Sequence, residues 1–430
     1  MRYKAPRGTR DILPDDSWKW QHVERVFRDT VARSGYREIR TPVFEETELF
    51  ARGIGDSTDI VRKEMYTFED RKGRSLTLRP EGTAGAVRAF IEHSMGRGAR
   101  LTKLYYFCPM FRYERPQAGR YRQFWQWGLE AIGSMNPAVD AEIIQLSVRL
   151  FERLGIPAPE AKVNSAGCPA CTPAYNALLR ETYASRIEEF CPDCRVRYER
   201  NPRRMFDCKV ESCLEILGDA PSILQSLCDE CAGHFEAVRE HLTSMGVRHA
   251  VDTSMARGLD YYTKTVFEVH YGGLGAQSAL CGGGRYDGLV EELGGPPTPA
   301  CGVSGGVDRL ISALEDQAVM AEGEPAPDVY LVSMGGRSDV VASRLATALR
   351  ERVSVETDYQ GRSLKAQMRE AGKLGAKYVV IVGEDELSRG VAVVKDMASG
   401  EQRDVPVDQL AVRLFESVAA ATTGSGNGNR

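Results

Sequence analysis

The chain lacks the features of a membrane or exported protein. No run in its 430 residues is long and apolar enough to span a bilayer. Its first residues, MRYKAPRGTRDILP, are polar and interrupted by proline, so they lack the apolar centre of a signal peptide. We find no internal repeat at the periods of solenoid proteins. These absences predict a cytoplasmic protein with no membrane partner.

The sequence also lacks an excess of charge of one sign. Its 56 Lys and Arg residues and 60 Asp and Glu residues give a formal net charge of −4. This balance carries no overall signal for nucleic acid, so any contact with RNA must come from local basic patches. With 42% hydrophobic residues, the chain has enough material for two to four domains with sizeable cores.

Cysteine is abundant by contrast, and it is unevenly distributed. Eight of the 11 cysteines lie within residues 168–231. In a cytoplasmic chain they favour metal binding or free thiols over disulfides. The first two pairs are 19 residues apart, which is within the range of zinc-ribbon spacing. The predicted ligands of a structural Zn2+ are therefore Cys168, Cys171, Cys191 and Cys194. Eight reduced cysteines in a helical insertion are the alternative.

The segment Phe111 to Glu130, FRYERPQAGRYRQFWQWGLE, predicts two strands joined by a basic turn. Because side chains alternate along a strand, each strand has one apolar face and one polar face. The polar face carries Arg112, Glu114, Arg122, Phe124, Gln126 and Glu130. Such a face indicates a binding floor, and the permanently charged guanidinium fork suits polyphosphate. An ordinary exposed hairpin with surface arginines is the alternative.

The remaining pattern predicts an α+β part followed by a part in which strands and helices alternate. In the first part, helices are expected over 16–33, 83–93 and 136–154, and extended segments over 37–45 and 63–81. Residues 322–328, EGEPAPD, indicate a linker. Beyond it, strands are expected over 329–333, 353–358, 378–382 and 391–395, and helices over 340–351, 364–374 and 409–419. This alternation is typical of a small α/β domain with a largely parallel sheet.

Several of these segments together resemble one family. The hairpin wording RYERPQAGRYRQF resembles motif 2 of the class II aminoacyl-tRNA synthetases, and specifically the histidyl-tRNA synthetases. RGLDYY at 257–262 and GGGRYDG at 282–288 are similar to the two signatures of that family. The helix and strand over 16–45 resemble motif 1, the dimer segment, and GVSGGVDRL at 302–310 resembles motif 3. The resemblance extends over almost the whole chain.

This resemblance implies an α+β fold with three functional parts. They are an antiparallel catalytic sheet with flanking helices, a cysteine-rich insertion, and a C-terminal α/β domain that binds the anticodon. The expected boundaries are 1–163 and 251–321 for the catalytic domain, 164–250 for the insertion, 326–420 for the anticodon-binding domain and 421–430 for a flexible tail.

The resemblance also implies a histidine–tRNA ligase that acts as a homodimer. Such an enzyme makes histidyl-adenylate from histidine and Mg2+-bound ATP, then transfers histidine to the 3′ end of histidine tRNA. Two regulatory proteins share the fold: the regulatory subunit of ATP phosphoribosyltransferase, and a domain that senses uncharged tRNA. The first lacks an anticodon domain and the second loses motif arginines, so residues 329–419 together with Arg112, Arg257 and Arg309 argue against both.

Site residues follow from the same resemblance. The expected ATP-binding residues are Arg112, Glu114, Arg120, Phe124 and Arg309. The expected histidine-binding residues are Glu81, Thr83, Gln126, Glu130, Tyr261, Tyr262 and Tyr286. Arg112 and Arg257 are the expected catalytic residues, and Arg257 would supply the positive charge that other class II enzymes obtain from a metal ion beside the α-phosphate.

Some positions have a second interpretation. Glu81 suits a surface ion pair with Arg79 or Arg88 as well as a contact to the substrate amino group. The glycines of 302–306 suit close packing as well as close approach of a nucleotide to the backbone. Trp125 stands where the family commonly has histidine, but alternation places it on the core face of its strand, away from the site.

Overall fold

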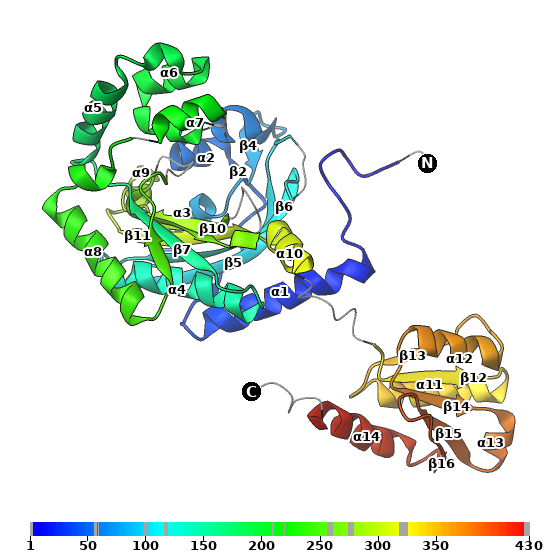
Figure 1. The fold of residues 1–430 in the computed structure, drawn as a ribbon. Coiled ribbons are helices and arrows are strands. Elements are labelled where there is room, and N and C mark those ends of the chain that lie inside the picture. Colours follow the sequence, from blue (N-terminus) through cyan, green and yellow to red (C-terminus); the bar gives the residue numbers. More distant parts are fainter. Residues whose placement is uncertain are drawn as a thin grey trace. The chain divides into compact units, whose positions relative to one another are not determined.

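The chain forms two compact units, Met1–Ala321 and Glu322–Arg430 (Figure 1). The computed structural model describes residues 3–55, 58, 60–98, 101–115, 119–208, 210–218, 220–255, 261–273, 279–317 and 326–424. Arg257 lies outside these residues. Within the described stretches, every helix is too short or too polar to cross a lipid bilayer.

An eight-stranded sheet is the framework of the larger unit. Its strand order is β1-β5-β6-β11-β10-β9-β7-β8, and only the two outermost pairs are parallel. The strands are β1 (Arg37–Glu38), β5 (Thr102–Phe111), β6 (Gln123–Ile132), β7 (Glu160–Ser165), β8 (His249–Val251), β9 (Thr263–His270), β10 (Ala279–Arg285) and β11 (Ala300–Gly306). A small second sheet has the order β2-β4-β3, formed by β2 (Phe44–Glu46), β3 (Tyr66–Glu69) and β4 (Ser75–Leu78).

The two faces of the large sheet have different roles. One face packs on α1 (Pro14–Ala32), α4 (Pro137–Arg153), α8 (Asp229–Ser244) and α10 (Val307–Asp316), with Phe27, Trp127 and Phe151 in the shared core. On the opposite face, α3 (Thr83–Glu92) packs beside Ile132 and Tyr286. The main apolar core therefore lies behind the sheet and leaves the other face for polar side chains.

Local sequence explains where the expected elements begin. Asn136 caps α4 by accepting a hydrogen bond from the Ala138 N–H at 2.9 Å, and Pro137 fits the first helical position. The 37–45 segment is split into β1 and β2 around Pro42, which cannot donate to a strand ladder. The smaller helices of this unit are α2 (Thr47–Ile54) and α9 (Leu289–Glu292).

The cysteine-rich segment forms a helical subdomain between β7 and α8 (Figure 1). Its helices are α5 (Thr172–Tyr183), α6 (Pro192–Arg200) and α7 (Glu211–Leu217), with short 3-10 turns η2 (Ile187–Glu189), η3 (Pro202–Asp207) and η4 (Ile223–Ser226). It has a small core of its own, in which Tyr175, Phe190 and Met205 are buried together with three cysteines, Cys194, Cys208 and Cys213.

The smaller unit has a five-stranded sheet of order β13-β12-β14-β15-β16. Its elements are β12 (Val329–Ser333), α11 (Arg337–Leu349), β13 (Val355–Thr357), α12 (Leu364–Lys373), β14 (Tyr378–Val382), α13 (Glu384–Ser388), β15 (Val391–Asp396), β16 (Gln402–Pro406) and α14 (Leu410–Gly424). The expectation of a largely parallel sheet is wrong for half of it, since β14–β15 and β15–β16 pair antiparallel. The sequence pattern missed α13 and β16; β16 is mostly exposed, so it has little apolar alternation.

A buried charge network joins α4 to the large sheet. Arg285 and Asp140 are both fully buried, and the Arg285 Nη1 donates to Asp140 Oδ1 at 2.5 Å. Thr265 and His234 hydrogen-bond with the other carboxylate oxygen at 2.7 Å. Asp287 pairs with Arg285 at 3.0 Å. A buried cation of this kind is stable only while its carboxylate partners are present.

We therefore predict that Asp140→Ala lowers the unfolding free energy of this unit by about 3–5 kcal/mol, because Arg285 loses its buried partner. All four tryptophans lie in the larger unit, so their fluorescence during urea unfolding reports on it alone. Glu152→Ala is the control: its ion pair with Arg149 is exposed, and the expected loss is about 0.5 kcal/mol or less. Equal losses of unfolding free energy in the two variants would show that Arg285 does not depend on Asp140.

Candidate active site

The polar face of the large sheet forms the floor of an open cleft with an empty volume of about 1380 Å³. The β5–β6 hairpin, the segment before β9, strands β10 and β11 and the first turn of α10 contribute its lining. Nine residues expected at the site line it: Glu81, Arg112, Glu114, Arg120, Phe124, Gln126, Tyr261, Tyr262 and Arg309. Segments as far apart as 81 and 309 in the chain therefore meet in one cavity.

Two arginines flank one carboxylate at the hairpin. The Arg112 Nε donates to the Pro80 carbonyl at 2.8 Å, and its guanidinium lies 5.4 Å from the Phe124 ring centroid. One Glu114 oxygen is 3.8 Å from Arg112 Nη1, and the other accepts from Arg120 Nη1 at 3.4 Å. These long ion pairs are partly exposed, so each arginine retains donors for an anion in the cleft.

Arg309 adds a third cation from the start of α10. Burial lowers its pKa, and the positive charge of Arg120 lowers it further. The negative charge of Glu268 opposes these two effects on the pKa of Arg309. An anion bound near Arg120 and Arg309 would relieve the repulsion between their like charges. This end of the cleft is therefore suited to phosphate oxygens.

Asp308 positions the hairpin, and the sequence did not predict this role. Its Oδ2 accepts from the Trp125 N–H at 2.9 Å, and its Oδ1 accepts from Arg10 at 2.7 Å. One carboxylate therefore ties α10 to β6 and to the N-terminal segment. Trp125 packs against the core, with its ring 5.7 Å from Phe107, which confirms the expectation that it faces away from the site.

Glu81 is buried at the N-terminus of α3. Its two carboxylate oxygens accept from the Thr83 and Ala84 N–H groups, each at 2.7 Å. The alternative of an ion pair with Arg79 or Arg88 is wrong: Arg79 donates to backbone carbonyls such as that of Pro109, and Arg88 pairs with glutamates elsewhere. Burial raises the pKa of Glu81 above its usual value, against the lowering effect of these N–H donors.

Glu130 lies directly beneath the cleft lining and is fully buried. One of its oxygens accepts from the Thr83 hydroxyl at 2.8 Å and from the Tyr106 hydroxyl at 3.3 Å. The other accepts a short hydrogen bond from Tyr286. Burial raises the pKa of Glu130 to about 8, although these hydroxyl donors lower it. Thr83, Glu130 and Tyr286 thus form one polar cluster behind the cleft.

Gln126 is the polar group of the lining with an unused acceptor. Its side chain is 7% exposed, and its Oε1 is buried without a hydrogen-bond partner in the described structure. A buried carbonyl oxygen in this state costs about 1–3 kcal/mol unless a donor reaches it. The cleft therefore presents a preformed acceptor for an N–H group of a ligand.

Two glycines make room for this cluster. A Cβ on Gly302 would lie 2.0 Å from Glu130 Oε2, and a Cβ on Gly128 would lie 2.2 Å from the Tyr106 ring. For Gly302 the packing interpretation is therefore the one the structure supports. Tyr106 was not predicted as a site residue. Gly128 pairs with it on β6, and a glycine at that position could have indicated that a large side chain lies over this part of the strand.

The cysteines are grouped differently from the expected zinc set. Cys168 and Cys171 do not meet Cys191 and Cys194. Instead, the first group consists of Cys168, Cys171, Cys228 and Cys231, and the second of Cys191, Cys194, Cys208 and Cys213. Within each group all sulfur atoms lie within 4.8 Å of one another. Sequence spacing suggested that the first pair meets the second, whereas the fold joins the first pair to the fourth and the second pair to the third.

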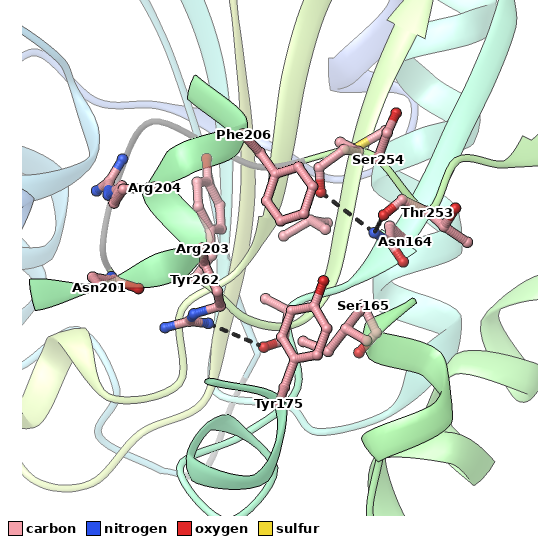
Figure 2. A pocket seen from close by; sticks show the side chains of 14 residues that line it. Asn164, Ser165, Tyr175, Asn201, Arg203, Arg204, Phe206, Thr253, Ser254 and Tyr262 are labelled. Atoms are coloured by element: carbon pink, nitrogen blue, oxygen red, sulfur yellow. Dashed lines mark hydrogen bonds between the residues drawn. The ribbon is translucent and has the colours of Figure 1, made fainter. Parts of the chain in front are cut away.

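A second cavity lies between the insertion and the large sheet (Figure 2). It has an empty volume of about 630 Å³. Tyr175, Arg203 and Phe206 face it from the insertion, and Asn164 faces it from the end of β7. Tyr262 lines this cavity as well as the main cleft. The insertion thus adjoins the active-site region.

Comparison with known proteins agrees with this geometry. The sequence profile of the histidyl-tRNA synthetase family matches residues 8–168 and 195–310, and that of the anticodon binding domain matches 328–416. The chain is 50% identical over 422 residues to the histidine–tRNA ligase of Geobacillus kaustophilus, covering 97% of this chain and 99% of that protein. It is 51% identical over 408 residues to that of Moorella thermoacetica, covering 95% and 96%.

Solved structures are similar as well. Apo S. aureus histidyl-tRNA synthetase matches with a TM-score of 0.82 at 39% identity, covering 96% of this chain and 100% of that one. A Bacillus halodurans structure described as an ATP phosphoribosyltransferase regulatory subunit/histidyl-tRNA synthetase matches with a TM-score of 0.66 at 22% identity, covering 89% and 99%, which shows a common fold alone.

An antiparallel sheet with an arginine-lined floor and a separate anticodon-binding unit defines a class II aminoacyl-tRNA synthetase. Within that class, identity of about half over nearly the full length decides the family. The chain belongs to the histidyl-tRNA synthetases.

The buried Glu130 should make stability depend on pH. Its pKa is about 8 in the folded protein, against 4.5 as the ordinary value, so the folded state holds its proton where the unfolded state has lost it. The contribution of Glu130 to the unfolding free energy is fully present below pH 4.5 and is lost as the pH rises toward 8. We predict that Glu130→Gln gains unfolding free energy relative to wild type over this window, by up to about 1.4 kcal/mol per pH unit.

Tryptophan fluorescence during urea unfolding, at several pH values from 5 to 8, measures this difference. Glu152→Gln, an exposed change, serves as the matched control and should follow wild type at every pH. Parallel curves for Glu130→Gln and wild type would show that Glu130 has no raised pKa.

Proposed function

We propose that this chain is a histidine–tRNA ligase that binds histidine and Mg2+-bound ATP in the described cleft and transfers histidine to the 3′ end of histidine tRNA. The observation that carries the proposal is the meeting of nine expected residues in one cleft, with cations at one end and buried acceptors at the other. Family membership at about 50% identity supports the same reaction.

At the cationic end, Arg112, Arg120 and Arg309 are proposed to hold the phosphates of ATP. Phe124 would stack on the adenine ring, and Glu114 would accept from its amino group. Mg2+ bound to ATP would neutralise phosphate charge, and the carboxylates of Glu114 and Glu268 in the lining are oxygen donors of the type it accepts. Catalysis then consists of positioning and charge stabilisation, because the attacking carboxylate is supplied by the substrate.

At the other end, the proposed histidine pocket is formed by Gln126, Tyr261 and Tyr262, with Glu81 for the amino group. The free Oε1 of Gln126 supports an N–H donor as the ligand. Glu130 is proposed to select the imidazole together with Thr83 and Tyr286, the hydroxyls that hold it. The family resemblance alone supports Arg257 as a further catalytic cation beside Arg112.

The same proposal includes assembly, location and a structural metal. We propose a cytoplasmic homodimer, because the helix and extended segment over 16–45 resemble the dimer segment of the family. Residues 326–420 are proposed to bind the anticodon, and residues 164–250 to be the insertion. Zn2+ is the proposed structural metal of that insertion, since clustered thiolates prefer it.

The regulatory alternatives are not favoured, because the cleft keeps Arg112 and Arg309 and the chain includes an anticodon-binding unit.

ATP–pyrophosphate exchange tests the activation step. We predict strong exchange with histidine and exchange near background with each of the other standard amino acids, because the pocket offers buried acceptors to an imidazole. Exchange is measured with purified protein and one amino acid at a time. Strong exchange with a different amino acid would refute the assignment, and none with any amino acid would favour a regulatory protein.

Arg309 should contribute to ATP use in particular. We predict that Arg309→Gln lowers kcat/KM for ATP by about 10- to 100-fold, since a hydrogen bond to a charged group is worth about 1.5–3 kcal/mol. The KM for histidine should change little. Arg149→Gln, an exposed arginine of α4, is the control and should match wild type. If only the KM for histidine changed, Arg309 would not be a phosphate-binding residue.

A further inference from the structure

The eight clustered cysteines form two nested groups of four. The outer group joins Cys168 and Cys171 to Cys228 and Cys231, and the inner group joins Cys191 and Cys194 to Cys208 and Cys213. Every ligand of the inner group lies, in sequence, between the two halves of the outer group. None of the cysteines in the described structure forms a disulfide.

Within each group, the distances between sulfur atoms fit four ligands of one tetrahedrally coordinated ion. Four thiolates at the zinc–sulfur distance of about 2.3 Å lie about 3.8 Å from one another at the corners of a tetrahedron. In the outer group, Cys168 Sγ is 3.7 Å from Cys171 Sγ and 3.9 Å from Cys228 Sγ. In the inner group, Cys191 Sγ and Cys208 Sγ are 3.8 Å apart. A disulfide needs about 2.05 Å, so these pairs are not oxidised bridges.

Backbone donors point at the sulfurs in both groups. In the outer group the Cys228 N–H donates to Cys171 Sγ at 3.2 Å. In the inner group the Cys191 N–H donates to Cys213 Sγ at 3.3 Å, and the Val210 N–H donates to Cys208 Sγ at 3.4 Å. Such bonds favour the negative thiolate that a metal requires, and they fix its direction. This observation is independent of the sulfur spacing.

The two groups hold different parts of the insertion. The outer group lies at its base, because Cys168 follows β7 and Cys228 precedes α8, 60 residues later. The inner group connects α6 to the η3–α7 segment. The core of the insertion is small, and Cys194, Cys208 and Cys213 are themselves part of it. A subdomain with so little apolar core needs an additional crosslink.

The base of the insertion is connected to the cleft. The Lys264 N–H donates to the Gly167 carbonyl at 2.7 Å, next to Cys168, and the Lys264 side chain pairs with Glu230, next to Cys231. Lys264 is the second residue of β9 and lies two residues after Tyr262, which lines both cavities. The outer group therefore fixes the chain that delivers Tyr262 to the site.

We propose that the insertion is a two-zinc module, with one Zn2+ bound by Cys168, Cys171, Cys228 and Cys231 at its base and a second bound by Cys191, Cys194, Cys208 and Cys213 in its outer lobe. This proposal rests on the structural zinc of the proposed function and adds the number of ions, their ligands and their separate roles. Each ion takes four thiolates and releases their protons to solvent on binding.

Metal analysis of the full chain tests the stoichiometry. Protein purified without chelator should contain two zinc ions per chain. Titration with a mercurial reagent should release both, and release should be complete after eight thiols have reacted. Cys191→Ser should retain one zinc, and Cys228→Ser should retain one. Cys108→Ala, a cysteine of β5 outside both groups, is the matched control and should retain two.

Cobalt substitution keeps the test independent of whether the variants fold. The wild-type chain, depleted of zinc and titrated with Co2+, should develop the intense absorption of tetrahedral thiolate sites and saturate at two equivalents. One zinc or none per chain, iron in place of zinc, or saturation at one equivalent of Co2+ would overturn the proposal. Zinc content and pyrophosphate exchange are measured separately, so failure of one leaves the other result standing.

Discussion

A carboxylate buried at the centre of the large sheet is the constraint on which the site depends. Glu130 has no access to water, so its oxygens must be satisfied by protein groups or lose their charge. The hydroxyls that satisfy them come from α3, from β5 and from the residue after β10, and Gly302 of β11 leaves space for one oxygen. The cluster thus aligns the elements that also present the cleft lining, and Gln126 lies on the same face of β6.

The distribution of charge along the cleft follows from the same architecture. Arginines cluster where the hairpin meets α10, and Asp308 connects these two elements by accepting from the Trp125 N–H. Because burial and the charge of Arg120 disfavour the charged form of Arg309, a bound anion would stabilise it. Binding of a polyphosphate and orientation of a second substrate next to it are therefore expected of one preformed cavity.

The sequence could predict those parts of the molecule that depend on short-range patterns. Alternation along the hairpin placed Trp125 and Trp127 in the core and Phe124 and Gln126 toward the cleft, because side chains of a strand alternate strictly. The roles of Asp308 and Tyr106 could not be predicted, since they depend on contacts between distant segments. The cysteine grouping failed for the same reason: spacing identifies pairs, but only the fold determines which pairs meet.

Transfer of histidine to tRNA is the most direct measure of the central claim, because it tests the use of ATP, histidine and tRNA by one chain. Purified protein is incubated with ATP, Mg2+, labelled histidine and either histidine tRNA or a panel of other tRNAs, and label attached to the 3′ end is counted. Our account predicts near-complete charging of histidine tRNA and background label on the others. Absence of charging by protein that catalyses pyrophosphate exchange, or charging of another tRNA, would contradict it.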